Sequence, residues 1–189
     1  MWMPLLLVAT VARAGGMPAD CSTGAIPDAP ATLFLDAATT PLPVTDVVEA
    51  GSISSGEGTP KWISYRLTLH DKADIFAPVE IDVTVLVAEG AALDGRTFRM
   101  PPQGSGEPPS VEPGTPEVQG WSVEDKRGSI DLNHVQVNGS LRLELGTRTG
   151  NTLPGRIRLC VPGAQKQRVG KDVVKEAVEV VGSFTAIVK

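Results

Sequence analysis

The clearest pattern in the chain is Val79-Glu80-Ile81-Asp82-Val83-Thr84-Val85-Leu86-Val87, in which aliphatic and mostly polar side chains alternate. Because successive side chains of a β-strand point to opposite faces of a sheet, this alternation predicts a strand with one face in a core and the other in water. The same period recurs at 63–69, 141–145 and 157–161. Weaker strand signals, bounded by turn residues, lie at 32–36, 46–53, 96–100, 118–124, 129–137 and 178–188.

Turn residues separate these segments: the chain contains 20 glycines and 16 prolines, which favour turns over long helices. Asn138-Gly139 is expected to form a two-residue hairpin turn, since both residue types adopt positive φ readily. Gly182 interrupts the last expected strand and is interpreted as a bulge. Many short strands with one apolar face predict an all-β protein. We expect a two-sheet antiparallel β-sandwich of the jelly-roll or immunoglobulin-like type, with a β-barrel as the alternative.

Residues 1–14 are expected to be a signal peptide. An apolar run that is too short to span a bilayer ends at Ala12-Arg13-Ala14, where the small residues suit a signal peptidase. No Lys or Arg precedes this run, so an apolar N-terminal strand is the alternative. The signal-peptide interpretation predicts a mature chain that begins at Gly15, an exported protein in the periplasm or outside the cell, and no transmembrane segment after cleavage.

Residues 15–189 are expected to form a single domain, because this length suits one core. Within the domain, 101–116 contain six prolines and three glycines, which predicts an extended loop. Cys21 and Cys160 are the only cysteines, and an even number in an exported chain predicts one disulfide. A lipid-anchored Cys21 is the alternative, although the preceding Pro18-Ala19-Asp20 does not fit a lipoprotein signal.

Recognisable catalytic machinery is missing from the sequence. Its only histidines are His70 and His134, and His134 lies at inward parity in an expected strand, where a structural role is the better interpretation. His70, Asp71 and Asp74 lie close together, but their spacing matches no calcium loop, and a zinc site has too few donors. We therefore expect no enzyme, no metal and no cofactor. A glycan-acting hydrolase with an unrecognised carboxylate pair is the alternative.

One tryptophan is a candidate binding residue. Trp62 shares strand parity with polar residues, so it is expected to face outward, where it could stack on a sugar ring or an apolar partner. The alternative is that 56–60 cover it. Trp121 shares parity with Val123 and is expected in the core.

The second candidate surface is a basic strip formed by Arg142, Arg148, Arg156 and Arg158. Residues 142–171 hold seven basic side chains and a single acid, Glu144. If the two strands pair, three of the arginines converge on one exposed sheet face, with Arg148 in the loop beside them. Arginine suits phosphate and carboxylate groups, so the strip predicts an anionic ligand. The alternative is a solvated face that is neutralised by acids from the first half of the chain.

The overall charge of the chain narrows the range of possible ligands. A formal net charge of −5 argues against nucleic-acid binding as the main role. We expect a non-enzymatic binding or assembly module of the cell envelope or the secreted fraction, which contacts an anionic envelope component or a protein partner. A structural subunit of an extracellular assembly is the other alternative.

Overall fold

The computed structural model describes residues 25–35, 38–53, 61–73, 77–101, 117–127, 130–135, 138–162, 168–169, 172–173 and 177–189. Within these ranges all regular secondary structure is β-strand, which confirms the all-β prediction. The strands are β1 (Thr32–Leu35), β2 (Ala38–Pro41), β3 (Val44–Ile53), β4 (Trp62–His70), β5 (Val79–Ala88), β6 (Thr97–Met100), β7 (Glu117–Asp125), β8 (Ile130–Asn133), β9 (Ser140–Leu145), β10 (Thr152–Val161), β11 (Arg168–Val169), β12 (Asp172–Val173) and β13 (Val178–Val188).

The main sheet has the strand order β6-β9-β10-β13-β3-β4-β5-β7-β8, and β1 pairs with both β13 and β2. All pairings are antiparallel except β13 with β3, which are parallel at Ile187↔Asp46 and Val188↔Val47. The sheet is therefore mixed, and the expectation of purely antiparallel strands is wrong at this one junction. The end strands β6 and β8 do not pair with each other, so the described sheet is not closed into a barrel.

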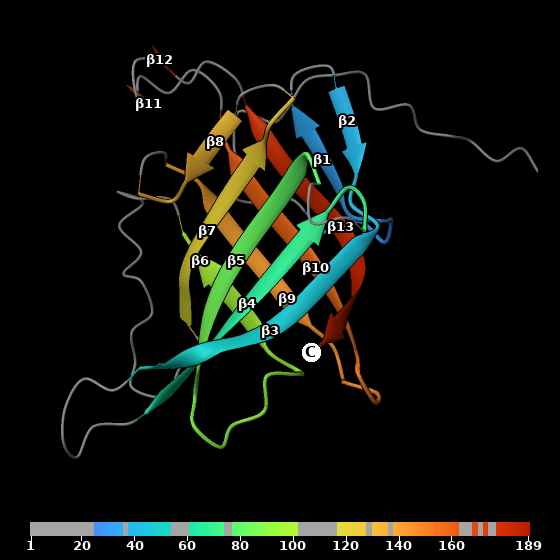
Figure 1. Cartoon of the computed structure of the whole chain (residues 1–189), viewed down its shortest axis with the longest axis vertical. Coiled ribbons are helices and arrows are strands. Elements are labelled where there is room, and N and C mark those ends of the chain that lie inside the picture. Colours follow the sequence, from blue (N-terminus) through green and yellow to red (C-terminus); the bar gives the residue numbers. More distant parts are fainter. Residues whose placement is uncertain are drawn as a thin grey trace, which may run out of the picture.

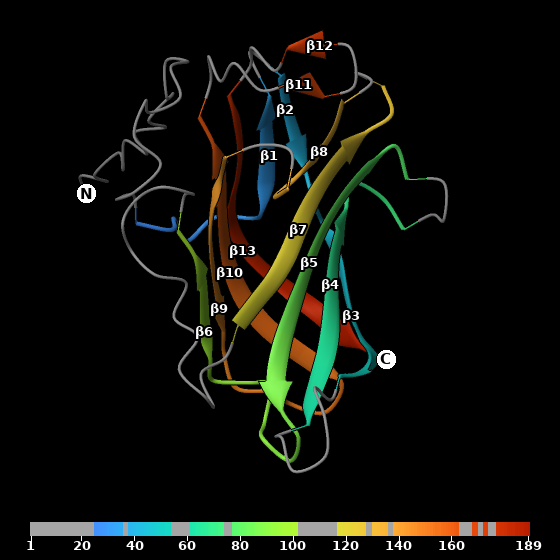
Figure 2. The same ribbon diagram turned by 90° about the vertical axis from the view of Figure 1, so that its left-hand side faces the viewer.

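The sheet bends so that its two halves lie face to face (Figures 1 and 2). We call the half with β3, β4, β5, β7 and β8 the β5 layer, and the half with β6, β9, β10, β13 and β1 the β10 layer. The parallel contact of β13 with β3 joins the layers along one side. On the other side β6 lies near β7 without pairing.

The core lies between the layers and follows the alternation in the sequence. The inward residues of β5 are at most 2% exposed, and so are Leu141, Leu143, Ile157 and Leu159 of the β10 layer. Burial of each such side chain stabilises the fold by about 1.5–3 kcal/mol. Trp121 is 3% exposed, which confirms its predicted place in the core.

One turn prediction and one bulge prediction are wrong. Asn138-Gly139 does not connect a hairpin, because β8 pairs with β7 whereas β9 pairs with β6 and β10. A glycine is needed there for another reason: a Cβ on Gly139 would lie 2.7 Å from Trp121 Cζ2. Gly182 is not at a bulge, since the register with β10 runs through it unbroken.

Gly182 instead allows a close approach of the segment that precedes β1. Its φ is +138°, and an added Cβ would lie 2.6 Å from the carbonyl oxygen of Ala29. The neighbouring amide of Ser183 donates to that same carbonyl at 2.6 Å, and Ala31 donates to the Ser183 carbonyl at 2.8 Å. Residues 29–31 are therefore held against β13 by backbone hydrogen bonds that only a glycine at 182 permits.

The remaining expectations on chain organisation fall largely outside the described residues. The predicted signal peptide, Cys21 and residues 102–116 of the proline-rich loop belong to this part of the chain. No helix that is long and apolar enough to cross a membrane occurs in the described part.

Candidate binding site

The arginines of the basic strip lie where the strand alternation places them. β9 and β10 pair with Arg158 opposite Arg142 and Arg156 opposite Glu144, so three of the arginines share the outer face of the β10 layer. Their exposure differs, because the side chain of Arg142 is 44% exposed and that of Arg158 only 8%. The expectation of one exposed arginine face is therefore wrong for Arg158.

Carboxylates neutralise two of these arginines, but both acids lie in the second half of the chain and not in the first half, where the alternative expected them. Arg142 forms an ion pair with Glu144 on its own strand. Arg158 forms an ion pair with Glu179 of β13, with 3.1 Å between Nη2 and Oε1. Glu179 lies opposite Cys160 in the register, one position diagonal from Arg158. Sequence reasoning missed this acid because nothing local to Arg158 indicates that β13 is its neighbour.

The other two arginines bond to the backbone. Arg156 donates from Nη2 to the carbonyl of Ile26 at 3.0 Å. Arg148 lies in the turn between β9 and β10, where its Nε donates to the carbonyl of Gly150 at 2.8 Å. Its own amide donates to Asp94 at 3.2 Å. Each member of the strip thus has a partner within the chain, which removes much of its attraction for an external anion.

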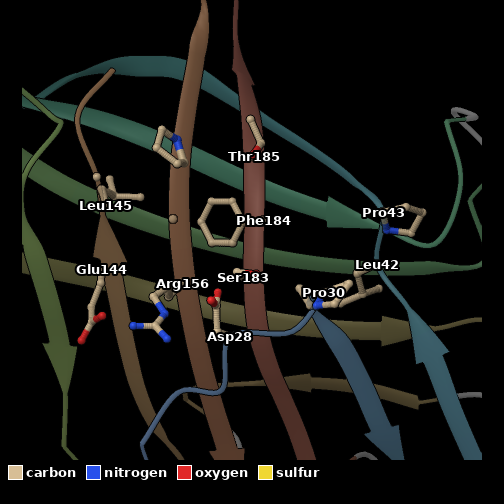
Figure 3. Close-up of a pocket in the computed structure, with 14 residues that line it drawn as sticks. Asp28, Pro30, Leu42, Pro43, Glu144, Leu145, Arg156, Ser183, Phe184 and Thr185 are labelled. Atoms are coloured by element: carbon tan, nitrogen blue, oxygen red, sulfur yellow. The ribbon is translucent and has the colours of Figure 1, made fainter. Parts of the chain in front are cut away.

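Arg156 also borders an open groove of about 720 Å³ in the β10 layer. β9, β10 and β13 form its floor, and 28–31 and 42–43 form its far wall (Figure 3). Its lining is mainly apolar and is supplied by Pro30, Ala31, Leu42, Pro43, Leu145, Pro154 and Phe184. At one end Arg156 lies between Glu144 and Asp28. The groove therefore offers apolar walls with a polar, charged end.

Small residues in the strands accommodate two of the rings that line this groove. The ring of Phe184 lies against Gly155, where an added Cβ would be 2.3 Å from Cζ. Gly146 is similarly close to Pro154, with 3.1 Å between an added Cβ and Cγ. A larger residue at either position would push the neighbouring ring. The positions of both rings therefore depend on the missing side chains of the glycines.

The guanidinium of Arg156 makes one hydrogen bond within the described residues, from Nη2 to the carbonyl of Ile26. The residue is half-buried, and its Nε has no hydrogen-bond partner among the described residues. A guanidinium carries five N–H donors, and an arginine held at a groove by one backbone contact can still orient toward a carbonyl or carboxylate. A ligand with an acceptor next to an apolar group would match this end of the groove.

The other sequence-predicted residues lie elsewhere. Trp62 is the first residue of β4, in the β5 layer, and is half-buried; residues 56–60, which were the alternative cover, are not described. His134 lies in the turn after β8 instead of in a strand, with its ring over Gly120. Trp62 and the arginines therefore do not form one site.

The acidic cluster near the end of β4 is engaged in local contacts. His70 Nδ1 lies 4.0 Å from Glu80, and Asp71 accepts from the amide of Val79 at 3.4 Å and lies 3.9 Å from Arg127. The described residues contain no group of three or more His, Cys, Asp or Glu that could hold a metal ion. Asp74, the third member of the predicted cluster, is outside the described residues.

The groove itself was not predicted. Its lining comes from segments far apart in the sequence, and none of them carries a motif. The chain matches no protein-family model, no curated protein and no solved structure. The geometry of the groove is therefore the main guide to function.

Proposed function

We propose that this protein is an exported, non-enzymatic binding or assembly module of the cell envelope or the secreted fraction, and that its groove holds a segment of a protein partner. The observation that carries the proposal is the apolar groove of about 720 Å³ with Arg156 at one end. Pockets of roughly 300–1,000 Å³ with apolar walls and few polar groups are typical binding sites.

A protein partner fits the groove better than an anionic polymer. Arg142 and Arg158 are already paired with carboxylates, and Asp28 and Glu144 flank Arg156. A polyanion would meet these acids as well as the arginine. An apolar or proline side chain, followed by a backbone carbonyl for Arg156, would instead match the lining.

The framework of the proposal is a two-layer β-sandwich with its core between the β5 and β10 layers. The facing layers in Figures 1 and 2 support it, although the parallel junction of β13 and β3 departs from a jelly-roll and from an immunoglobulin-like fold. Export predicts that N-terminal sequencing of the protein from its source gives Gly15. Retention of Met1 would contradict it.

The groove is tested by selecting displayed random peptides on the immobilised protein and measuring their affinities by calorimetry. Thr185 lines the groove, so Thr185→Trp should fill it and weaken the selected peptides by about tenfold or more. Ile187→Trp is the matched control, since Ile187 is 39% exposed on the same strand but does not line the groove. Equal affinities of the two variants would overturn the proposal.

The anionic alternative has its own readout. Heparin and polyphosphate are added to the same proteins at low and high salt, where an anion-binding face loses affinity as screening rises. Two results together would favour an anionic ligand over a protein partner. Arg142→Glu would abolish binding of the polymer, and no selected peptide would depend on the groove.

A further inference from the structure

A smaller, polar pocket of about 250 Å³ lies on the outer face of the β5 layer, on the other layer from the groove. β4, β5 and β7 supply most of its lining. These three strands are neighbours in the sheet (Figure 1). The register places Arg66 opposite Thr84, and Asp82 opposite Ser122. These side chains alternate with buried valines and leucines, so they share the face that points away from the core.

The ring of His134 forms one wall of this pocket. An added Cβ on Gly120 would lie 2.5 Å from His134 Cε1, so only a glycine at 120 leaves space for the ring. The amide of His134 donates to the carbonyl of Trp121 at 3.2 Å, which anchors the turn after β8 to β7. Asp82, Thr84 and Ser122 are half-buried although they face outward. The pocket is therefore a formed hollow in the sheet surface.

Two opposite charges line the pocket without pairing. Asp82 accepts a hydrogen bond from Thr68 at 2.6 Å through Oδ1. Arg66 is exposed and forms no ion pair with any residue that the structure describes. A ligand could therefore find a guanidinium that binds a carboxylate in a bidentate manner, beside a carboxylate oxygen that accepts hydroxyl groups. The hydroxyls of Thr84 and Ser122 can both donate and accept.

We propose that this pocket binds one hexuronic acid unit, a sugar ring that carries a carboxylate. The sugar carboxylate lies on Arg66, and ring hydroxyls donate to Asp82 and bond to Thr84 and Ser122. The volume suits a single pyranose ring. This site is independent of the groove in the β10 layer, and either can fail without the other.

The test is an NMR titration of the isotope-labelled protein with glucuronate, galacturonate, glucose and acetate. At least one uronate should shift amide signals of β4, β5 and β7 with an affinity about tenfold above that of glucose. Acetate should bind far more weakly than the uronate, because it lacks hydroxyls. Acetate shifts as strong as those of the uronate would reduce the pocket to a simple anion site, and no shifts with either uronate would overturn the proposal.

Variants separate the charge from the hydroxyl contacts. Arg66→Gln should lower the uronate affinity to that of glucose, whereas Thr84→Val should weaken both sugars. Arg99→Gln is the matched control, because Arg99 is an exposed arginine on β6 of the other layer. If the Arg66→Gln variant binds the uronate as tightly as the Arg99→Gln variant does, the proposal is also overturned.

Discussion

Arg158 and Glu179 form an ion pair within the outer face of the β10 layer, with 3.1 Å between Nη2 and Oε1 and with side chains 8% and 4% exposed. The pair bridges neighbouring strands β10 and β13. Arg158 Nε and Glu179 Oε1 lack a well-aligned hydrogen bond among the described residues, so the contact is mainly electrostatic. Taking two charges out of water is costly, and removing one member of such a pair leaves the other as an uncompensated buried charge.

Glu179→Gln should therefore lower the free energy of unfolding by about 3–5 kcal/mol, because it leaves a buried guanidinium without its counter-charge. Urea unfolding measures the change. Glu144→Gln is the control: its partner Arg142 is 44% exposed, so the loss should stay within about 1 kcal/mol. Arg158→Met/Glu179→Leu should recover most of the stability lost in Glu179→Gln. Equal losses in the two single variants would show that burial of the pair does not matter.

Gly182→Ala should detach residues 29–31 from β13. The added Cβ would lie 2.6 Å from the Ala29 carbonyl oxygen, and φ is +138°. We expect a loss of about 1–3 kcal/mol from backbone strain alone, and faster hydrogen exchange at the Ser183 amide. Gly90→Ala is the control, because Gly90 also has a positive φ of +80° but nothing within 4 Å of its Cβ position. Unchanged exchange at Ser183 in Gly182→Ala would contradict the role of Gly182.

The alternation of apolar and polar side chains predicted the strands reliably. The alternation in Val79–Ala88 is local, and every strand residue there faces the side that its parity predicts. The turn at Asn138-Gly139 failed because a local signal cannot tell which strands become neighbours. β8 and β9 are adjacent in sequence but belong to different layers.

The candidate site was harder to predict for the same reason. Arg156 was recognised as a polar-face arginine, but its groove depends on Pro30, Leu42 and Phe184, which only the folded sheet brings together. The neutralisation of Arg158 depends on a strand that starts 20 residues later in the chain. Such long-range pairings carry no periodicity of their own in the sequence.

Cys21 and Cys160 should be joined by a disulfide, which stays a prediction because Cys21 is outside the described residues. Cys160 is 1% exposed on β10. The unfolded, unreduced protein should therefore react with no thiol reagent, and peptide mapping should give one fragment with both cysteines. Cys160→Ala should cost a few kcal/mol at most, roughly as for other native disulfides. Two reactive thiols per chain in the unreduced protein would rule the bond out.

Tyr65 should titrate above its ordinary range. Burial raises the pKa of its phenol above 10.0, nearby Glu49 raises it further, and Arg148 partly offsets both. The folded state then holds the proton more tightly than the unfolded state. Stability is therefore full below the unfolded pKa, near 10, and falls as pH rises through the folded pKa.

Tyr65 is the only tyrosine, so the ultraviolet absorbance of tyrosinate reports this group alone. The midpoint should lie above 10.0, Glu49→Gln should lower it, and Arg148→Gln should raise it. A midpoint at or below 10.0 in the folded protein would contradict the burial of the phenol.

Gly155→Ala should strain the floor of the groove. The new methyl group would lie 2.3 Å from Phe184 Cζ and 3.1 Å from the carbonyl oxygen of Glu144, so the ring must move while the strand cannot. Overpacking of this kind costs about 1–3 kcal/mol. Phe184→Leu, which shortens the side chain, should be destabilising alone but should relieve the clash when combined with Gly155→Ala. The two changes should therefore be non-additive by at least about 0.5 kcal/mol in a double-mutant cycle followed by urea unfolding. Additive losses would mean that the ring does not lie over Gly155.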